Sequence, residues 1–566
     1  MDDKTLVLAK GLITPRYVDV AMDALGAHRS ALASLVAQRR LPDAGFHPAL
    51  IEALLAQLAL MDANNYHGHA GAGEREGRVY SQTVLQRHRF MSHGVGRSGD
   101  LLADQPKAPG SSLMKALANV LCRDALRQAG LGNTGSAIVF PTATGLALAL
   151  VLQAARAQRP PGARYVVMPR IDQKTCVKCI AAAGLVPVVV QLRRCAAPAA
   201  ASAPPAHVDP AAAASAAAPP QPAAAGSGLD LFVESHVDDV RAAVEALPGG
   251  AAAVVCLLSV TSCFAPRLPD DPLAMGRLAA ALGVPHVVNN AYGVQSPAVA
   301  RRLDAALGAH AAAVAKADTE HRRAAAAAAK AADGTAAADA PAVPLPAPAL
   351  DCRVDAFVQS GDKNFLVPVG GSVVAGPLAK AGLPEATAAL YPGRAGASAT
   401  FDLFVTLLEM GRDGWRRLRE ERLTRLAVCH SRLAAFAAAR GETLLQHPRN
   451  DISFAVTLTY LAAATAGKKT PAGLGAELFR SAVSGARVVV PDRANVTKIA
   501  GAKVGSSFGT HHDESPQPLL VMACGIGMTA HDVDVTFARL EAAYPVPRTG
   551  LAARVRSPDR RAAGPS

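Results

Sequence analysis

Short apolar runs that end in polar or glycine-bearing loops recur through the middle of the chain. Runs of this kind predict buried strands, and a helix is expected at residues 146–158 after the first of them. The alternation of strand and helix from about residue 110 to 400 predicts an α/β layered sheet. Open sheets of this class bind ligands beyond the carboxyl ends of their strands. The five strands are expected at residues 136–140, 165–168, 251–259, 286–288 and 356–359.

The flanking segments have other patterns. Residues 1–60 place apolar positions at helical spacing, and a long helix is expected from 401 to about 440, interrupted near Gly411 and Gly414. Two low-complexity inserts interrupt the middle, and neither is assigned a function. The first, 196–228, is expected to be a disordered loop, and the second, 305–350, an alanine-rich helix followed by a Pro/Ala tether. The expected units are a helical extension with phosphate-binding loops (1–105), a large sheet domain (106–395), a smaller α+β domain (396–548) and a basic disordered tail (549–566).

Net charge and cysteine content indicate the kind of partner and the cellular compartment. The 566 residues carry a net charge of +13, which fits an anionic partner such as a phosphate, a nucleic acid or a membrane surface. Nine cysteines scattered through a long chain favour reduced thiols in the cytosol. Residues 128–155 are uncharged, but Pro141 to Gly145 cut the run, so no transmembrane segment is expected.

Lys363 follows the fifth expected strand at its carboxyl end, between apolar stretches. Desolvation lowers the pKa of an amine and frees its lone pair, so a lysine at such a position suits Schiff-base chemistry. The alternative is an ordinary surface lysine at a turn.

Two glycine-rich loops, residues 71–78 and 94–100, carry arginines. Glycine lets backbone amides approach an anion, and the guanidinium fork suits phosphate oxygens, so two such loops favour anion binding over flexible loops with incidental arginines. Cys176 and Cys179 have the spacing of half a zinc site. Without a second CxxC or an HxxxH we expect no structural metal there, nor at His511.

Ten segments together resemble one known family, the O-phosphoseryl-tRNA(Sec) selenium transferases. They are GEREGRV, GVGRSGD, QPKAPGSS, PRIDQK, TSCFAPR, NNAYGVQS, DAFVQS, GDKNF, VPVGG and YPGRA. The resemblance runs from about residue 45 to 540, outside the two inserts. It implies a cytoplasmic fold-type I pyridoxal phosphate (PLP) enzyme, a homotetramer with active sites between subunits. It also implies conversion of O-phosphoseryl-tRNA(Sec) to selenocysteinyl-tRNA(Sec) with selenophosphate, through elimination of phosphate and addition of selenium.

The same resemblance assigns residues to roles. Lys363 matches the catalytic lysine that holds the cofactor. The cofactor-binding set implied with it is Arg75, Ala143, Thr144, Gly145, Gln173, Asn289, Ser360 and Lys363. The set implied for the substrate phosphate is Arg75, Arg97, Ser98, Gln105, Lys174 and Arg394.

Two segments depart from the family pattern. At residues 479–487, where a family arginine reads the tRNA acceptor end, the arginine is displaced by one position, and residues 504–509 replace a family segment. Two rival functions are a PLP enzyme acting on a free amino acid, such as a cysteine desulfurase or selenocysteine lyase, and a non-catalytic tRNA-binding scaffold. The first needs a mobile catalytic cysteine and no phosphate clamp. The second predicts no cofactor absorbance dependent on Lys363.

Overall fold

The computed structural model describes residues 3–196, 230–332, 350–465 and 467–546. Apart from residue 196, the first predicted insert lies outside the described residues. The second is described at residue 350 and as far as residue 332, where the expected alanine-rich helix ends. The expected basic tail also lies outside them.

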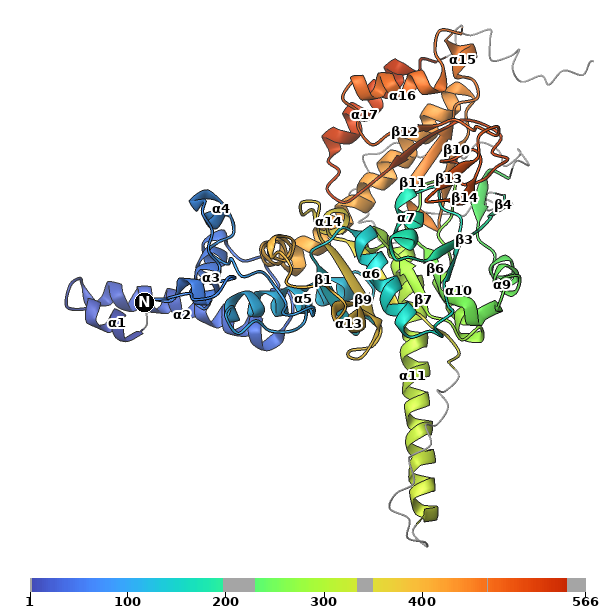
Figure 1. Ribbon diagram of the computed structural model, residues 1–566. Helices are drawn as coiled ribbons and strands as arrows, with labels where there is room; N and C mark the ends of the chain where they lie inside the picture. The colour runs from blue at the N-terminus through green and yellow to red at the C-terminus, as the bar shows by residue number, and fades with distance from the viewer. Residues whose placement is uncertain (1–2, 197–229, 333–349, 466, 547–566) are drawn as a thin grey trace, which may run out of the picture.

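A seven-stranded sheet forms the centre of the molecule, with strand order β1-β9-β8-β7-β6-β2-β3 (Figure 1). Every neighbouring pair is parallel except the two made by β9. The five predicted strands are confirmed; β6 begins three residues later than expected because the 3-10 turn Gly250–Ala253 precedes it. The strands are β1 (Ser136–Phe140), β2 (Tyr165–Pro169), β3 (Val186–Val190), β6 (Val254–Val260), β7 (His286–Asn289), β8 (Ala356–Ser360) and β9 (Ser372–Gly376).

Helices cover both faces of this sheet, as the alternation of side chains along its strands requires. On β2, Val166 and Met168 pack into the larger core with α5, α6 and α7, whereas Val167 packs into a separate core with α9 and α10. The helix expected at residues 146–158 is α6, which begins two residues earlier. The helices are α5 (Pro109–Gln128), α6 (Thr144–Ala157), α7 (Lys174–Ala182), α9 (Val237–Glu245), α10 (Pro272–Ala281), α11 (Pro297–Ala332) and α13 (Leu383–Ala388).

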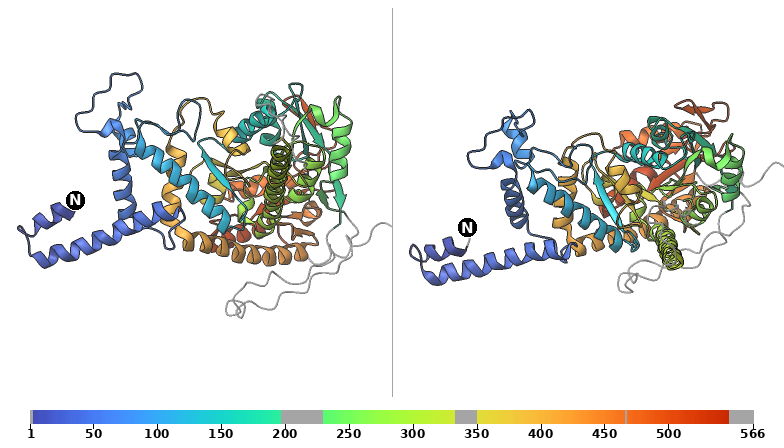
Figure 2. Two further views of the ribbon diagram at one scale, coloured as in Figure 1. Left: turned by 90° about the horizontal axis from the view of Figure 1, so that it is seen from below. Right: turned by 60° about the horizontal axis from the view of Figure 1, so that its bottom comes forward.

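The N-terminal helices project from one side of the body, beyond α5 (Figures 1 and 2). Helix α3 packs its leucines into the large core, but α1 and the first half of α2 are largely solvent-exposed. Leu8 and Leu12 are 77% and 86% exposed. These helices are α1 (Asp3–Ala9), α2 (Pro15–Gln38), α3 (Pro48–Leu60) and α4 (Gln82–Arg87).

A second, antiparallel sheet of order β10-β11-β15-β12, here called the C-terminal sheet, follows the long helix α14 (Ser398–Arg440). The predicted interruption of α14 is confirmed at Gly411, whose φ of 59° is non-helical. Helices α16 and α17 share a core with this sheet and with α14. Elements of this part are β10 (Leu444–His447), β11 (Asn450–Thr457), α15 (Leu461–Ala464), α16 (Pro471–Arg480), β12 (Arg487–Val489), β13 (Thr497–Ile499), β14 (Ala502–Gly505), β15 (Leu519–Ala523) and α17 (Ala530–Ala543).

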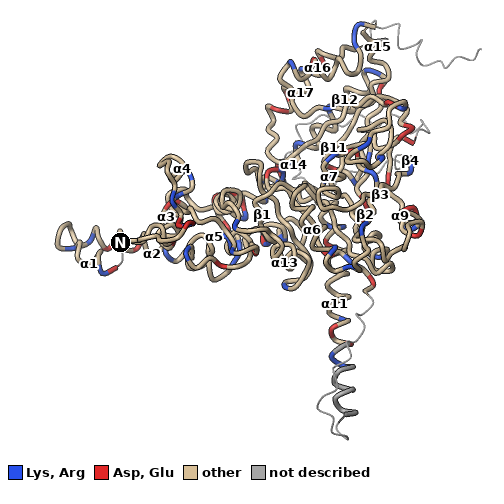
Figure 3. Tube along the Cα trace, viewed as in Figure 1, with Lys and Arg blue, Asp and Glu red and all other residues tan. Residues whose placement is uncertain are grey.

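Two general features bear on partners. Lysine and arginine are scattered over the whole trace rather than gathered on one element (Figure 3). Across the described residues, no helix combines the length and the apolar character that crossing a membrane needs.

Candidate active site

Lys363 lies in a one-turn helix, α12 (Gly361–Phe365), directly after the buried strand β8. The segment is therefore helical where the sequence indicated a simple turn. Gln295 Nε2 donates to the Lys363 carbonyl at 2.6 Å, which fixes the backbone. The half-buried amine lies 5.7 Å from the centroid of the Tyr292 ring, a cation–π contact. The lysine is thus held at the carboxyl edge of the parallel strands against an aromatic wall.

An anion cradle lies beside this lysine at the start of α6. Ala143 occupies the N-cap position and provides no side-chain cap, so the first amides of the 14-residue helix stay available to a ligand. Gly145 is needed here, because a Cβ on it would lie 2.4 Å from Thr175 Cγ2 in α7. The Thr144 hydroxyl is hydrogen-bonded to that of Ser360, at the end of β8. The structure therefore brings the predicted cofactor residues Thr144, Gly145 and Ser360 together.

Asn289 ends β7 in a fixed orientation. The backbone amide of Ala291 donates to Asn289 Oδ1 at 3.3 Å, and Asn289 Nδ2 donates to Cys176 Sγ at 3.1 Å. The Cys176 thiol in turn donates to Gln173 Oε1 at 3.5 Å, so one cysteine joins two predicted cofactor residues. Burial raises the pKa of Cys176 to about 11, which keeps the thiol neutral. The sequence interpretation considered this cysteine only as a metal ligand and missed its contact with Asn289.

The glycine-rich loop of residues 94–100 is joined to the segment that carries Arg394. Val95 and Ala395 exchange backbone hydrogen bonds of 2.9 and 3.0 Å, and Arg394 Nη1 donates to the His93 carbonyl at 3.4 Å. Arg97 and Ser98 are exposed on this loop. The structure therefore gathers three residues of the predicted substrate-phosphate set.

The rest of that set is dispersed. Arg75 is exposed on the other loop, and Lys174 is exposed at the start of α7. Gln105 is half-buried, and its backbone amide donates to Ser112 Oγ. Neither arginine loop contacts Lys363 or Asn289 through any hydrogen bond, ion pair or ring contact of the described residues. In Figure 1 the α3 and α4 region, from which the first loop extends, is separated from β7 by α5 and β1.

Metal ligation has no support in the described part of the chain, where no three His, Cys, Asp or Glu side chains are grouped to hold an ion. Cys176 and Cys179 lie in α7, and burial raises the pKa of both thiols.

A family model described as O-phosphoseryl-tRNA(Sec) selenium transferase matches residues 61–214, 227–322 and 343–545. The chain belongs to this family. A selenium transferase of Leishmania donovani is 40% identical over 97% of this chain and 100% of its own length. Its counterpart in Dictyostelium discoideum is 32% identical over 95% of this chain and 98% of its own.

The solved structures agree on the fold. An archaeal O-phosphoseryl-tRNA(Sec) selenium transferase superposes with a TM-score of 0.71, covering 94% of this chain and 98% of the archaeal one, at 24% identity. The predicted family is confirmed, and so is the expected α/β architecture of a fold-type I PLP-dependent transferase, with its mostly parallel sheet flanked by helices.

Proposed function

We propose that this selenium transferase converts O-phosphoseryl-tRNA(Sec) to selenocysteinyl-tRNA(Sec), with PLP bound at Lys363 and selenophosphate as the selenium donor. The observation that carries the proposal is Lys363 at the carboxyl edge of the sheet, beside an uncapped helix N-terminus, in a chain of this family. The transferase activity and the PLP dependence follow from family membership.

The residues at the sheet edge fit PLP. The free amides of Ala143 to Gly145 suit its phosphate, and the Lys363 amine suits its aldehyde. The hydroxyls of Thr144 and Ser360 close the cradle, and Asn289 presents a fixed amide from the neighbouring strand. When bound, PLP supplies an electron sink for charge released at the α-carbon of the substrate.

The chain's own groups perform the remaining tasks. We assign to the Lys363 amine the removal of the α-proton and its later return. Arg97, Ser98 and Arg394 bind the phosphoseryl phosphate and stabilise its charge as it leaves. Gln105, Lys174 and Arg75 are assigned to the same phosphate, with Arg75 also reaching the cofactor.

We also propose a homotetramer, because within one chain the arginine loops do not contact Lys363. A neighbouring subunit could supply the loop that completes each site. Exposed apolar side chains on α1, α2 and the turn between them, including Leu8, Leu12 and Tyr17, offer surface for such an assembly. Light scattering after size-exclusion chromatography tests the tetramer, and a monomeric active enzyme would refute it. We also propose a cytoplasmic location.

The rival functions fit less well. A cysteine desulfurase needs a mobile, reactive cysteine, whereas Cys176 is buried in a hydrogen-bonded position with a raised pKa. A pure tRNA-binding scaffold has no need of a lysine and an anion cradle at one sheet edge, and the curated relatives are named as transferases.

The decisive experiment incubates the purified protein with PLP, selenophosphate and either phosphoseryl-tRNA(Sec) or seryl-tRNA(Sec). We expect selenocysteinyl-tRNA only from the phosphorylated substrate. Lys363→Ala should stay folded, bind PLP loosely and form no product. Equal conversion of seryl-tRNA, or full activity of Lys363→Ala, would contradict the proposal.

A further inference from the structure

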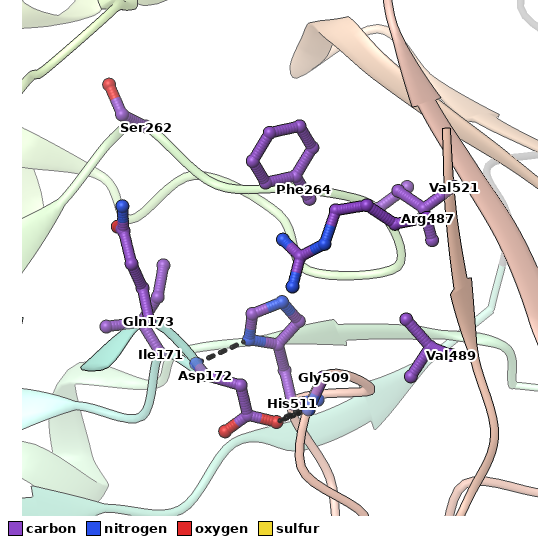
Figure 4. A pocket seen from close by; sticks show the side chains of 11 residues that line it. Ile171, Asp172, Gln173, Ser262, Phe264, Arg487, Val489, Gly509, His511 and Val521 are labelled. Carbon is purple, nitrogen blue, oxygen red and sulfur yellow. Dashed lines mark hydrogen bonds between the residues drawn. The ribbon is translucent and has the colours of Figure 1, made fainter. Parts of the chain in front are cut away.

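A small cavity lies beside the candidate active site, between the ends of β2 and β6 and the C-terminal sheet (Figure 4). Its volume of about 30 Å³ suffices for a water or a small polar group. The polar side chains on its wall include Gln173 and Ser262 from the large sheet and Arg487 and His511 from the C-terminal part. The sequence interpretation treated His511 only as a poor metal ligand.

The tautomer of His511 is set by the backbone. The amide of Asp172 donates to His511 Nδ1 at 2.9 Å, so Nδ1 must be an acceptor and Nε2 must carry the proton. Burial lowers the pKa of His511 to about 4, which keeps this neutral tautomer at physiological pH. His511 therefore contributes an N–H donor to the cavity.

Arg487 approaches from the opposite wall on β12. Its guanidinium lies 5.5 Å from the centroid of the Phe264 ring and has no hydrogen-bond or ion-pair partner among the described residues. In Figure 4 the guanidinium points toward the His511 ring. Two donors thus face each other with no protein acceptor between them.

The one carboxylate on the wall, Asp172, is already occupied. Its oxygens accept from Arg170 Nε at 2.9 Å and from the amides of Gly509 and His511 at 2.7 Å each. Arg170 also pairs with Asp513, so both carboxylates are bound to that one arginine. Among the charged side chains that line the cavity, Arg487 alone makes no ion pair with a described residue.

We propose that Arg487 and the Nε2–H of His511 form an anion subsite for a phosphate group of the tRNA 3′ end. The planar guanidinium fork and a second convergent donor match phosphate oxygens. The inference rests on the proposed function. In phosphoseryl-tRNA the amino-acid carboxyl is esterified to the tRNA, so phosphates are the only anionic groups that this substrate offers.

The position of the subsite agrees with this source. Lys363 Nζ lies 5.7 Å from the Tyr292 ring centroid, the Tyr292 and Phe264 ring centroids are 5.8 Å apart, and the Arg487 guanidinium lies 5.5 Å from the Phe264 centroid. Arg487 is therefore linked to Lys363 through successive contacts with two aromatic rings. The aminoacyl ester separates the reacting carbon from the terminal phosphodiester by a ribose, so a phosphate bound here belongs to the backbone and not to the phosphoseryl group.

The test compares Arg487→Gln, Arg487→Lys and His511→Gln in the PLP-loaded enzyme. Arg241→Gln, which removes an exposed charge from α9, is the matched control. Binding of phosphoseryl-tRNA(Sec) is measured over a range of salt concentrations, and inhibition of turnover by inorganic phosphate is measured separately. Thermal unfolding reports whether each variant is folded, which matters most for the buried His511.

Arg487→Gln should weaken tRNA binding about tenfold, with Arg487→Lys intermediate. It should also reduce the slope of log affinity against log salt by about 0.7–0.9, the value of one phosphate contact. The control Arg241→Gln should change the affinity and the salt slope only by the small amount that the loss of one distant charge causes.

Other results of the binding, inhibition and turnover measurements would each lead to a different conclusion. Unchanged tRNA binding with weaker inhibition by inorganic phosphate would support the anion subsite but assign it to a free phosphate-type substrate. No change in either measurement for a folded Arg487→Gln would overturn the subsite and leave the cavity to water. Failure of the wild type to convert phosphoseryl-tRNA would refute the proposed function instead, because the binding measurements do not depend on turnover.

Discussion

Gly145 offers the sharpest test of the cofactor cradle, because one identified atom occupies the space that a side chain would need. A Cβ at this position would lie 2.4 Å from Thr175 Cγ2, whereas the next atom, Thr175 Cβ, would be at an ordinary 3.9 Å. Thr175 is β-branched, so two of its three staggered χ1 rotamers keep a heavy atom on that side. We therefore expect Gly145→Ala to displace the first turn of α6 against α7.

The size of the effect follows from two opposing contributions. Overpacking of this kind costs about 1–3 kcal/mol, while alanine in a helix gains up to about 1 kcal/mol over glycine. The net loss of global stability should thus be at most about 2 kcal/mol when the gain is realised in full. The affinity for PLP gains nothing from the helix propensity of alanine, since the displaced amides are those we assign to the cofactor phosphate, and it should fall about 5- to 150-fold.

The assay is a PLP titration followed by absorbance, alongside thermal unfolding. Thr175→Ser removes only Cγ2, so the double variant Gly145→Ala/Thr175→Ser should recover most of the lost affinity while Thr175→Ser alone resembles the wild type. Gly162→Ala, where a Cβ meets no atom within 4 Å, is the control glycine. Wild-type affinity in Gly145→Ala, or a double variant as weak as the single, would refute the steric reasoning.

Three further expectations follow. Arg97→Ala should lower kcat/KM for phosphoseryl-tRNA about 10- to 150-fold, with Arg97→Lys partly active; a loss of PLP affinity in a PLP titration would mean that Arg97 serves the cofactor instead. Gly94→Ala should reduce turnover with PLP binding retained, because Gly94 has a φ of 74° and its Cβ would lie 2.3 Å from the Ala395 carbonyl oxygen; normal turnover would separate this contact from the clamp. Burial lowers the pKa of His286 and His511 from 6.5 to about 4, so between those values the unfolded chain binds protons that the folded chain does not. Denaturant titrations should show stability falling as pH drops from about 6.5 to 4, by up to about 1.4 kcal/mol per pH unit for each histidine, and His511→Gln should reduce the slope.

The central strands were predictable because each is a short apolar run closed by glycine, proline or polar residues. That pattern reflects burial on both faces of a mostly parallel sheet. Lys363, Thr144 and Asn289 could also be placed at one edge, since each directly follows such a run. The antiparallel strand β9 was visible only as an apolar run after two glycines, with nothing in it to specify its place between β1 and β8.

Long-range contacts were beyond the reach of sequence patterns. His511 meets Asp172 across 339 positions of sequence, and Asn289 meets Cys176 across 113. Such pairs form only when distant segments of the chain pack together. Packing between distant segments produces no periodic pattern in the local sequence. The neutral His511 and the unpaired Arg487 therefore became visible only in three dimensions.

The hydrogen bond between Gln295 and the Lys363 carbonyl belongs to a longer series. Gln295 Oε1 accepts from the amide of Ile526, and its backbone carbonyl accepts from the buried Arg422, which also holds the carbonyls of Asp451 and Cys524. One glutamine side chain thus spans from Lys363 to the segment after β15. These hydrogen bonds couple the two sheets mechanically at this point, so we expect local fraying of the C-terminal segment to loosen Lys363 before it exposes the large core. Native-state hydrogen exchange should accordingly report Ile526 and the Lys363 turn as one cooperative unit.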